Sequence, residues 1–187
     1  MSSNNSNQDN FIRFALEAKV LSFGEFKTKA GRLSPYFFNA GEFNDGARLS
    51  ALGRYYSKAL QESKLQFDML YGPAYKGITL AAATAISLAD DGINVPYAYN
   101  RKGRVVIIDD VISAGTSVRE SVDLIRKAGA EPAAVLIALD RMERSGNAVE
   151  VGDKSAVQAV EQEFGLPVIS IANLSGLMSF LTASSDT

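Results

Sequence analysis

The stretch from Arg104 to Ser117 reads RVVIIDDVISAGTS and holds the residue types in this chain best suited to chemistry. Its aliphatic first part ends on two adjacent carboxylates, Asp109 and Asp110. Small and hydroxylic residues from Ser113 to Ser117 follow, and a helix is expected to begin at about Thr116. Backbone N–H groups at a helix start favour a phosphate, whereas carboxylates accept hydrogen bonds from sugar hydroxyls or hold Mg²⁺. The stretch therefore suggests a phosphorylated sugar as the ligand.

Less specific roles also fit parts of this stretch. Two adjacent Asp residues after a strand can simply cap a helix or lie solvated in a loop. A strand that ends in Asp also occurs in NTPases, but the chain has no G-x-x-x-x-G-K-[ST] phosphate loop. It has no G-x-G-x-x-G either, which weakens a dinucleotide site. A phospho-acceptor Asp in a receiver-like domain would leave the run from Ser113 to Ser117 without a role.

Composition narrows the possible chemistry. A chain of 187 residues fits one domain with a sizeable core. Its net charge of -2 gives no sign of nucleic-acid binding, and no apolar run is long enough to span a membrane. There is no Cys, which is compatible with the cytoplasm, and no His, the commonest general base. Catalysis must therefore use carboxylates, Lys, Tyr, backbone amides or a hard cation.

Hydrophobic periodicity predicts the elements that position these residues. From residue 67 onward strands and helices mostly alternate, which is typical of a parallel sheet that binds ligands at the carboxyl ends of its strands. Strands are expected at 67–71, 96–100, 104–109, 133–139 and 167–172, and helices at 11–19, 47–62, 77–90, 116–128, 155–164 and 174–181. A hairpin is expected at 25–39, and residues 1–9 are expected to form a disordered tail.

The complete string of aliphatics, DD, two aliphatics and S-A-G-T-S resembles the phosphoribosyl-pyrophosphate signature of the type I phosphoribosyltransferases. Four more segments resemble the orotate phosphoribosyltransferase family, and together the likeness covers nearly the whole chain. These segments are Phe23–Gly41, Phe67–Ile78, Pro96–Lys102 and Ala138–Gly146. The resemblance implies a single α/β domain over residues 1–187, with a central parallel sheet flanked by helices. It also implies a small N-terminal hood over the base, to which residues 20–45 contribute.

The resemblance implies an enzyme, a pentosyltransferase of pyrimidine (UMP) biosynthesis. Such an enzyme transfers the phosphoribosyl group from 5-phosphoribosyl 1-pyrophosphate to orotate, with Mg²⁺, and releases orotidine 5′-monophosphate and pyrophosphate. It also implies a cytoplasmic homodimer with active sites near the subunit interface. Neither a nucleic acid nor a membrane is expected as a partner.

The site residues implied by the resemblance form three sets. Catalysis is assigned to Asp109, Asp110, Arg101 and Lys102. Phosphoribosyl pyrophosphate is bound by these four together with Tyr75, Lys76, Val111, Ile112, Ser113, Ala114, Gly115, Thr116 and Ser117. Orotate is bound by Lys29, Phe37, Phe38, Ser113 and Arg141. Mg²⁺ is held mainly by the pyrophosphate and the ribose, with Asp109 and Asp110 contributing through water.

Several of these residues could also have a simpler role. Phe37 and Phe38 alternate faces on a strand, so one of them is expected in the core. The pair Tyr75-Lys76 can be a solvated loop tip, and Lys29 can be only a turn charge. Arg141 can form a local ion pair of little consequence.

The sequence departs from the family after Lys102. Family members continue there into a long mobile loop with further Lys residues and a His, whereas Gly103-Arg104 follows here at once. The cause is a segment missing from the sequence as written, a deletion by design or a natural variation. A lid of this type excludes water and supplies cations to the leaving group. We therefore expect substrate binding with slow turnover. The alternatives are a non-catalytic regulator that binds phosphoribosyl pyrophosphate, and a phosphoribosyltransferase acting on another base.

Overall fold

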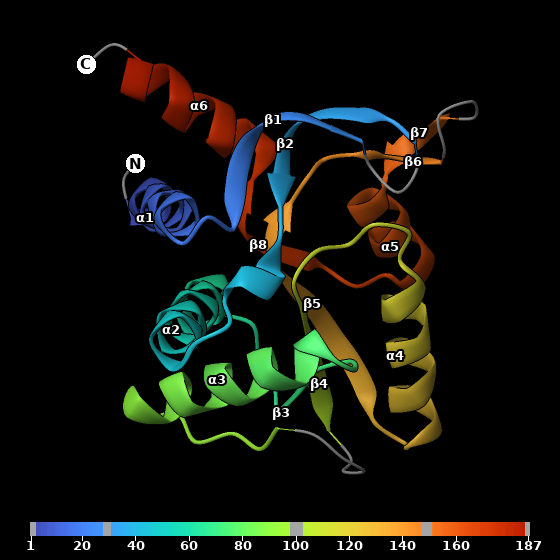
Figure 1. Ribbon diagram of the computed structural model, residues 1–187. Coiled ribbons are helices and arrows are strands. Elements are labelled where there is room, and N and C mark those ends of the chain that lie inside the picture. Colours follow the sequence, from blue (N-terminus) through green and yellow to red (C-terminus); the bar gives the residue numbers. More distant parts are fainter. Residues whose placement is uncertain (1–2, 28–30, 98–102, 147–150, 186–187) are drawn as a thin grey trace.

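A four-stranded parallel sheet forms the centre of the computed structural model, which describes residues 3–27, 31–97, 103–146 and 151–185 (Figure 1). The strands, in spatial order, are β3 (Met69–Tyr71), β4 (Arg104–Asp109), β5 (Glu131–Asp140) and β8 (Val168–Asn173). All three neighbouring pairs run parallel. The predicted parallel sheet is confirmed.

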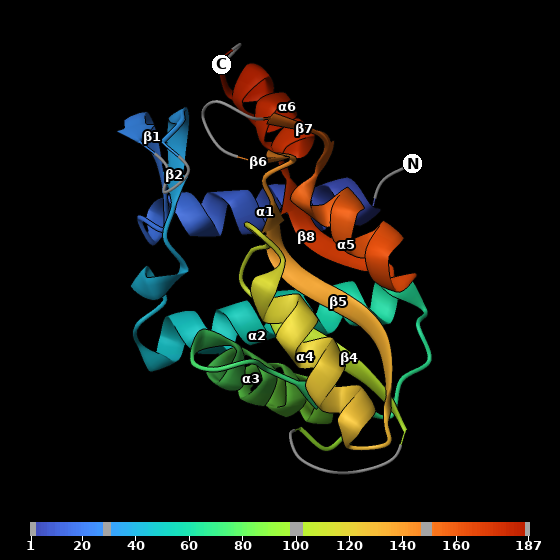
Figure 2. The ribbon, with the colours of Figure 1, turned by 90° about the vertical axis from the view of Figure 1, so that its right-hand side faces the viewer.

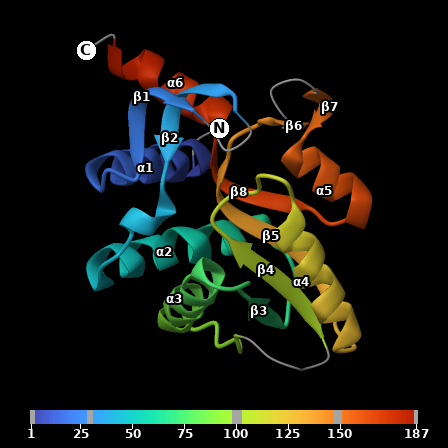
Figure 3. The same cartoon turned by 45° about the vertical axis from the view of Figure 1, so that its right-hand side comes forward.

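Helices cover both faces of this sheet (Figures 1 and 3). On one face lie α1 (Ser3–Glu17), α2 (Gly46–Ser63), α3 (Lys76–Asp90) and α6 (Leu174–Ser185), and on the other lie α4 (Thr116–Lys127) and α5 (Ala156–Phe164). The alternation of side chains along β4 supplies both cores. Val106 and Ile108 belong to the core that α1, α2 and α3 cover, whereas Val105 and Ile107 belong to the core that α4 and α5 cover. β4 is thus buried on both faces and ends in the acidic pair.

Two antiparallel hairpins lie outside the sheet. The first, β1 (Leu21–Lys27) with β2 (Leu33–Phe38), stands beside α1, and the short helix η1 (Ala40–Glu42) follows it (Figure 2). The sequence predicts this hairpin but not its early start. The second, β6 (Arg144–Gly146) with β7 (Val151–Ser155), is not predicted, because its strands are short and carry little apolar alternation.

The amino-terminal helix corrects one expectation. Helix α1 begins at Ser3, so the predicted disordered tail is wrong for residues 3–9. These residues are polar, but Asn7 is buried and the Gln8 side chain lies directly against Gly176 of α6. Packing against α6 therefore orders the first turns, and a local sequence pattern does not reveal such a contact.

The predicted strand at 96–100 falls partly outside the described residues. Within them, Tyr97 forms a single parallel bridge with Leu70 of β3. Among the described residues, no helix combines the length and apolar character needed to cross a membrane.

Candidate functional site

Asp109 and Asp110 stand where β4 leaves the sheet, and their surroundings differ. The Asp109 carboxylate is buried, and it accepts hydrogen bonds from the Ser117 hydroxyl at 3.0 Å and from the Asp110 N–H at 2.9 Å. Burial, followed by the charge of Asp110, raises the pKa of Asp109 from 3.8 to about 6. Asp110 is more open and forms an ion pair with Lys76 Nζ at 2.9 Å. The two carboxylates are therefore not equivalent, although they are adjacent and of the same type.

Close backbone approach brings Lys76 to Asp110. Lys76 is the first residue of α3, and Gly77 follows it. A Cβ atom at Gly77 would lie 2.8 Å from the carbonyl oxygen of Ile108, closer than a side chain tolerates. Glycine at this position lets α3 begin directly against the end of β4.

The loop after Asp110 is buried at Ile112 and Gly115 and exposed at Ser113, Ala114 and Thr116. Ile112 is 6% exposed and packs into the core under α4, whereas Ser113, Ala114 and Thr116 are exposed. Gly115 precedes the helix in the left-handed conformation, with φ of 73°, and forms no side-chain cap. The first N–H groups of α4 are thus left without a capping side chain, which is the arrangement that favours an anion.

A single cleft of about 640 Å³ joins these groups. It is lined by residues 73–76, before α3, and by residues 109–118. The structure therefore brings together Tyr75, Lys76 and all the predicted residues from Asp109 to Ser117. Tyr75 stands at the rim with 89% of its surface exposed. The predicted Arg101 and Lys102 lie outside the described residues.

Tyr56 of α2 is a residue of this site that the sequence did not indicate. Its side chain is fully buried, and its hydroxyl donates a 2.6 Å hydrogen bond to the backbone carbonyl of Asp109. The next carbonyl, that of Asp110, accepts from the Ala138 N–H at 2.9 Å. The backbone of the acidic pair is therefore held by α2 and by β5. A Tyr at a core position of a helix is the available signal, since a buried hydroxyl requires a partner.

A second group of polar residues lies beyond the end of β5, around Arg141. The Arg141 guanidinium lies 5.9 Å from the centre of the Tyr36 ring and 3.4 Å from Glu143. Glu143 also pairs with Arg32 of the first hairpin at 3.7 Å. Within the described part of the chain, Arg141 Nε is buried without a hydrogen-bond partner. We call Arg32, Tyr36, Arg141 and Glu143 the arginine cluster.

The two predicted Phe residues of β2 face opposite sides of the strand, as expected: one packs against the core and the other is exposed. Phe38 packs against the main core, which confirms that one of the pair is structural. Phe37 is 48% exposed and stacks on Phe26 with ring centres 5.5 Å apart. Neither Phe nor Arg141 lines the cleft of the acidic pair, whereas Ser113 does. The predicted Lys29 lies outside the described residues.

Known proteins resemble this chain along its whole length, although no protein-family model matches it. An orotate phosphoribosyltransferase of Polynucleobacter necessarius is 88% identical over 204 residues, covering 100% of this chain and 92% of its own. One from Ralstonia nicotianae is 62% identical over 203 residues, covering 100% of this chain and 90% of its own. The crystal structure of orotate phosphoribosyltransferase from Francisella tularensis has a TM-score of 0.86 at 39% identity, covering 93% of this chain and 90% of its own.

These findings first define a class. A Mycobacterium tuberculosis orotate phosphoribosyltransferase in complex with 5-phospho-α-D-ribosyl 1-diphosphate shares the fold, with a TM-score of 0.66 at 17% identity over 91% of this chain and 98% of its own. The parallel sheet with its acidic pair and helix-opening loop is the type I phosphoribosyltransferase fold. Within that class, the identity to curated relatives shows that the chain belongs to the orotate phosphoribosyltransferase family.

The chain also differs internally from these relatives. The match to the P. necessarius protein spans 204 residues, whereas this chain supplies 187 and is covered completely. About 17 aligned positions of that relative thus have no counterpart here. A gap of this size agrees with the departure from the family that the sequence indicates after Lys102.

Proposed function

We propose that this chain is an orotate phosphoribosyltransferase in activity as well as in family. The observation that carries the proposal is the single cleft in which the acidic pair, Lys76 and the uncapped start of α4 converge. In the reaction, the bond from ribose C1 to pyrophosphate breaks, a bond from C1 to a ring nitrogen of orotate forms, and the proton on that nitrogen is released. The products are orotidine 5′-monophosphate and pyrophosphate, as in the pyrimidine pathway to UMP.

The cleft supplies a partner for each part of phosphoribosyl pyrophosphate. The carboxylates of Asp109 and Asp110 accept hydrogen bonds from the ribose hydroxyls. Backbone N–H groups and hydroxyls from Ser113 to Ser117 surround the 5′-phosphate. Lys76 and the exposed Tyr75 meet the pyrophosphate, so the Lys76–Asp110 ion pair seen here must open when substrate binds. Cations near the leaving pyrophosphate stabilise its developing charge.

The arginine cluster fits the base. Orotate is a flat ring that carries a carboxylate, which matches an aromatic surface and an Arg fork. The unpartnered Nε of Arg141 within the described residues gives one buried donor that an incoming carboxylate would satisfy. A sensor of phosphoribosyl pyrophosphate has less use for such a cluster, so the regulator is the weaker alternative.

Mg²⁺ fits this site as a partner of the substrate rather than as a fixed metal. Among the described residues there is no group of three His, Cys, Asp or Glu side chains that could hold a metal. The acidic pair offers only carboxylate oxygens, and Mg²⁺ commonly binds one or two carboxylates together with phosphates and water. We propose that the pyrophosphate and ribose hold the ion, with Asp109 and Asp110 contributing through water. The ion would neutralise charge on the leaving group.

The aligned positions of the P. necessarius protein that have no counterpart here affect the turnover rate that we expect for this chain. We propose that the missing positions belong to the lid that follows Lys102 in the family, and that this chain binds both substrates but turns over slowly. Steady-state assays should compare the 187-residue chain with a form that carries the inserted segment of the P. necessarius relative. We expect a large rate increase with little change in substrate affinity, because a lid excludes water and adds cations. Full activity without the insertion would contradict the role of the lid, and failure to bind both substrates would contradict the function.

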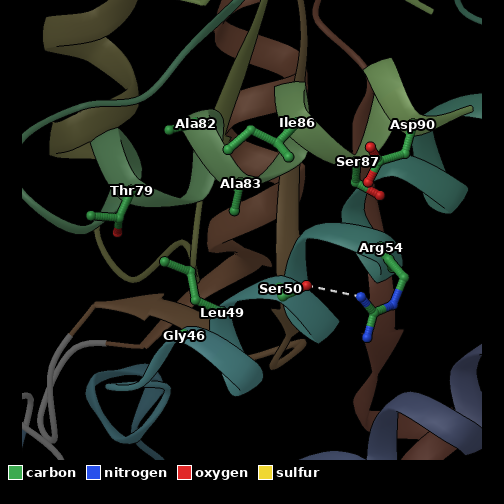
Figure 4. A pocket seen from close by; sticks show the side chains of 10 residues that line it. All are labelled: Gly46, Leu49, Ser50, Arg54, Thr79, Ala82, Ala83, Ile86, Ser87 and Asp90. Atoms are coloured by element: carbon green, nitrogen blue, oxygen red, sulfur yellow. Dashed lines mark hydrogen bonds between the residues drawn. The ribbon is translucent and has the colours of Figure 1, made fainter. Parts of the chain in front are cut away.

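We further propose that the chain works as a homodimer, through the face formed by α2 and α3. Figure 4 shows the groove there, about 270 Å³ in volume, with Leu49 on one side and Ala82, Ala83 and Ile86 on the other. Ile86 is 65% exposed and lines this groove together with Leu49, Ala82 and Ala83, so the apolar side chains form one contiguous open surface. The same helix α3 begins at Lys76 in the cleft, so a second copy on this face would lie near the active site.

Sedimentation can test this face with two matched substitutions. Ile86→Asp should convert a dimer to a monomer, because a buried charge opposes association. Leu124→Asp changes an equally large exposed apolar residue on α4, at the opposite face, and should leave the dimer intact. A monomeric parent chain, or a dimeric Ile86→Asp variant, would overturn the assignment.

The remaining expectations are proposals of the same kind. We place the enzyme in the cytoplasm, with small-molecule substrates and neither a nucleic acid nor a membrane as partner. We treat residues 1–187 as one domain in which residues 20–45 form the hood over the base. The ion pair between Arg32 and Glu143 supports the hood, because it ties the first hairpin to the segment after β5.

A further inference from the structure

Arg119 of α4 links the phosphate loop to a neighbouring helix. Its Nη1 donates a 2.8 Å hydrogen bond to the carbonyl oxygen of Ala114. Its Nε and Nη2 donate to both carboxylate oxygens of Glu163 on α5, at 2.8–3.0 Å. One guanidinium therefore holds a loop carbonyl with one edge while a bidentate carboxylate fixes the other. Neither residue belongs to the sites assigned above.

The position of the guanidinium fixes the orientation of one peptide unit in the loop. The Ala114–Gly115 peptide is trans, so the Ala114 carbonyl and the Gly115 N–H point in opposite directions. A carbonyl held by Arg119 thus directs the Gly115 N–H away from the guanidinium. Gly115 is itself pressed against α5, since a Cβ atom there would lie 3.1 Å from Val160 Cγ2. The loop is therefore supported by α5 through two contacts.

This contact has little value for stability alone. The side chains of Arg119 and Glu163 are 42% and 41% exposed, and exposed ion pairs contribute little to the free energy of folding. A planar guanidinium with its fork already occupied loses less freedom when it makes a further hydrogen bond. The arrangement is thus better suited to orienting the loop than to holding the fold together.

We propose that Arg119, oriented by Glu163, is a positioning residue for the 5′-phosphate: it fixes the Ala114–Gly115 peptide so that the Gly115 N–H faces the bound phosphate. This inference rests on the proposed role of residues 113–117 in binding that phosphate. Arg119 acts through the loop and does not itself touch the ligand.

A purely electrostatic role makes the opposite prediction for one variant. If Arg119 only attracted the phosphate by its charge, Glu163→Gln would strengthen binding, because it removes a competing negative charge. If Arg119 positions the loop, Glu163→Gln weakens binding, because the guanidinium loses its bidentate partner. Arg119→Lys also separates the two roles, because it keeps the positive charge but loses the planar guanidinium that binds two partners at once. A role of charge alone predicts unchanged binding, whereas a positioning role predicts weaker binding.

The test is calorimetric titration of the 187-residue chain with ribose 5-phosphate, which carries the 5′-phosphate without the pyrophosphate, and with phosphoribosyl pyrophosphate and Mg²⁺. We expect Arg119→Lys and Arg119→Met to weaken both ligands by about fivefold to tenfold, which is within the net range of one ordinary hydrogen bond. Glu163→Gln should weaken them by about threefold, and the double variant should be no worse than Arg119→Met alone. Orotate binding and the melting temperature should not change.

Arg126→Met is the matched control. Arg126 lies on the same helix and stacks on Phe164 of α5, 5.9 Å from the ring centre, but is placed at the opposite end from the loop. Its removal should leave ribose 5-phosphate binding unchanged. Unaltered binding in Arg119→Lys, or tighter binding in Glu163→Gln, would overturn the positioning role. A parent chain that binds neither phosphorylated ligand would instead reject the proposed site.

Discussion

The phosphate cleft and the arginine cluster are built in different ways. The cleft takes most of its lining from one continuous stretch, residues 109–118, which is carried by β4 and the start of α4. The arginine cluster joins Arg32 of a peripheral hairpin to Glu143 and to the backbone carbonyl of Arg144, which lie more than a hundred residues later. The cleft is therefore fixed by local chain geometry, whereas the cluster depends on a contact between distant segments.

This difference suggests that the two regions respond differently to change. Substitutions in the cleft act on a backbone that is held by the sheet and by Tyr56. Substitutions in the arginine cluster act on a few partly exposed charges, and each has more than one partner. A substitution in one region should therefore leave the ligand of the other region almost unaffected.

The largest expected effect is on orotate binding. Arg141→Met should weaken orotate by about thirtyfold, because a charge-assisted bidentate contact of about 2 kcal/mol is lost. Phosphoribosyl pyrophosphate affinity should stay within about twofold, since Arg141 does not line the cleft. Calorimetry with each substrate measures both, and Arg144→Met, a neighbouring exposed Arg, is the control. Equal losses for both substrates would show that the two regions are one unit.

The next effect is a pH dependence confined to the cleft. Because the pKa of Asp109 is raised to about 6, its carboxylate takes up a proton as the pH falls below that value and accepts hydrogen bonds less well. The affinity for phosphoribosyl pyrophosphate should then decrease as the pH falls. The decrease should be steeper in the parent than in Asp109→Asn, because in the variant only the ligand phosphate, whose second pKa is about 6, still titrates in this range. Orotate affinity, measured by the same titrations across the pH range, should not share this fall.

The same pKa shift predicts a stability effect with the opposite sign. The folded pKa of Asp109 exceeds the ordinary 3.8, so the buried carboxylate destabilises the fold above about pH 6, and the penalty disappears as the pH falls towards 3.8. The melting temperature of Asp109→Asn should exceed that of the parent most at about pH 8 and least near the ordinary pKa. A difference independent of pH would contradict the burial of the charge.

A smaller effect is expected from the hydrogen bond between the Tyr56 hydroxyl and the backbone carbonyl of Asp109. Tyr56→Phe keeps the ring but removes the hydroxyl from the Asp109 carbonyl, which should cost about 1–2 kcal/mol of stability. It should also lower turnover by about threefold to tenfold, because the carboxylates lose part of their alignment. Thr84→Val removes another fully buried hydroxyl, bonded to Leu80 in α3, and should change stability alone. If Tyr56→Phe and Thr84→Val have equal turnover, the Tyr56 hydroxyl does not align the carboxylates for catalysis.

The smallest expected effect is an increase in orotate affinity. Glu143 competes with orotate for Arg141, at 3.4 Å in the structure. Glu143→Gln should therefore strengthen orotate binding by about twofold to threefold, the range for a partly exposed ion pair. If orotate binds more weakly instead, Glu143 orients Arg141 rather than competing with the ligand. The measurement is the orotate titration used for Arg141→Met.

The sequence predicts the cleft better than the arginine cluster for a physical reason. The string from Arg104 to Ser117 forms a strand, a loop and a helix start in immediate succession, so its geometry follows from local rules. The alternation of strands and helices that builds the parallel sheet was predictable from periodicity in the same way, whereas the β6–β7 hairpin was not. Contacts such as Tyr56 with Asp109, Arg119 with Glu163 and Arg32 with Glu143 join separate elements. A single sequence specifies such contacts only through the completed fold.

The alternation of β4 between two cores restricts how this protein can change. Inserting one residue into β4 would send Val106 and Ile108 to the α4 face and exchange the sides on which Asp109 and Asp110 emerge. Inserting two residues would preserve both faces. The strand that carries the site can thus lengthen only by pairs of residues. The distance between the sheet and the ligand therefore changes in steps of about 6.6 Å.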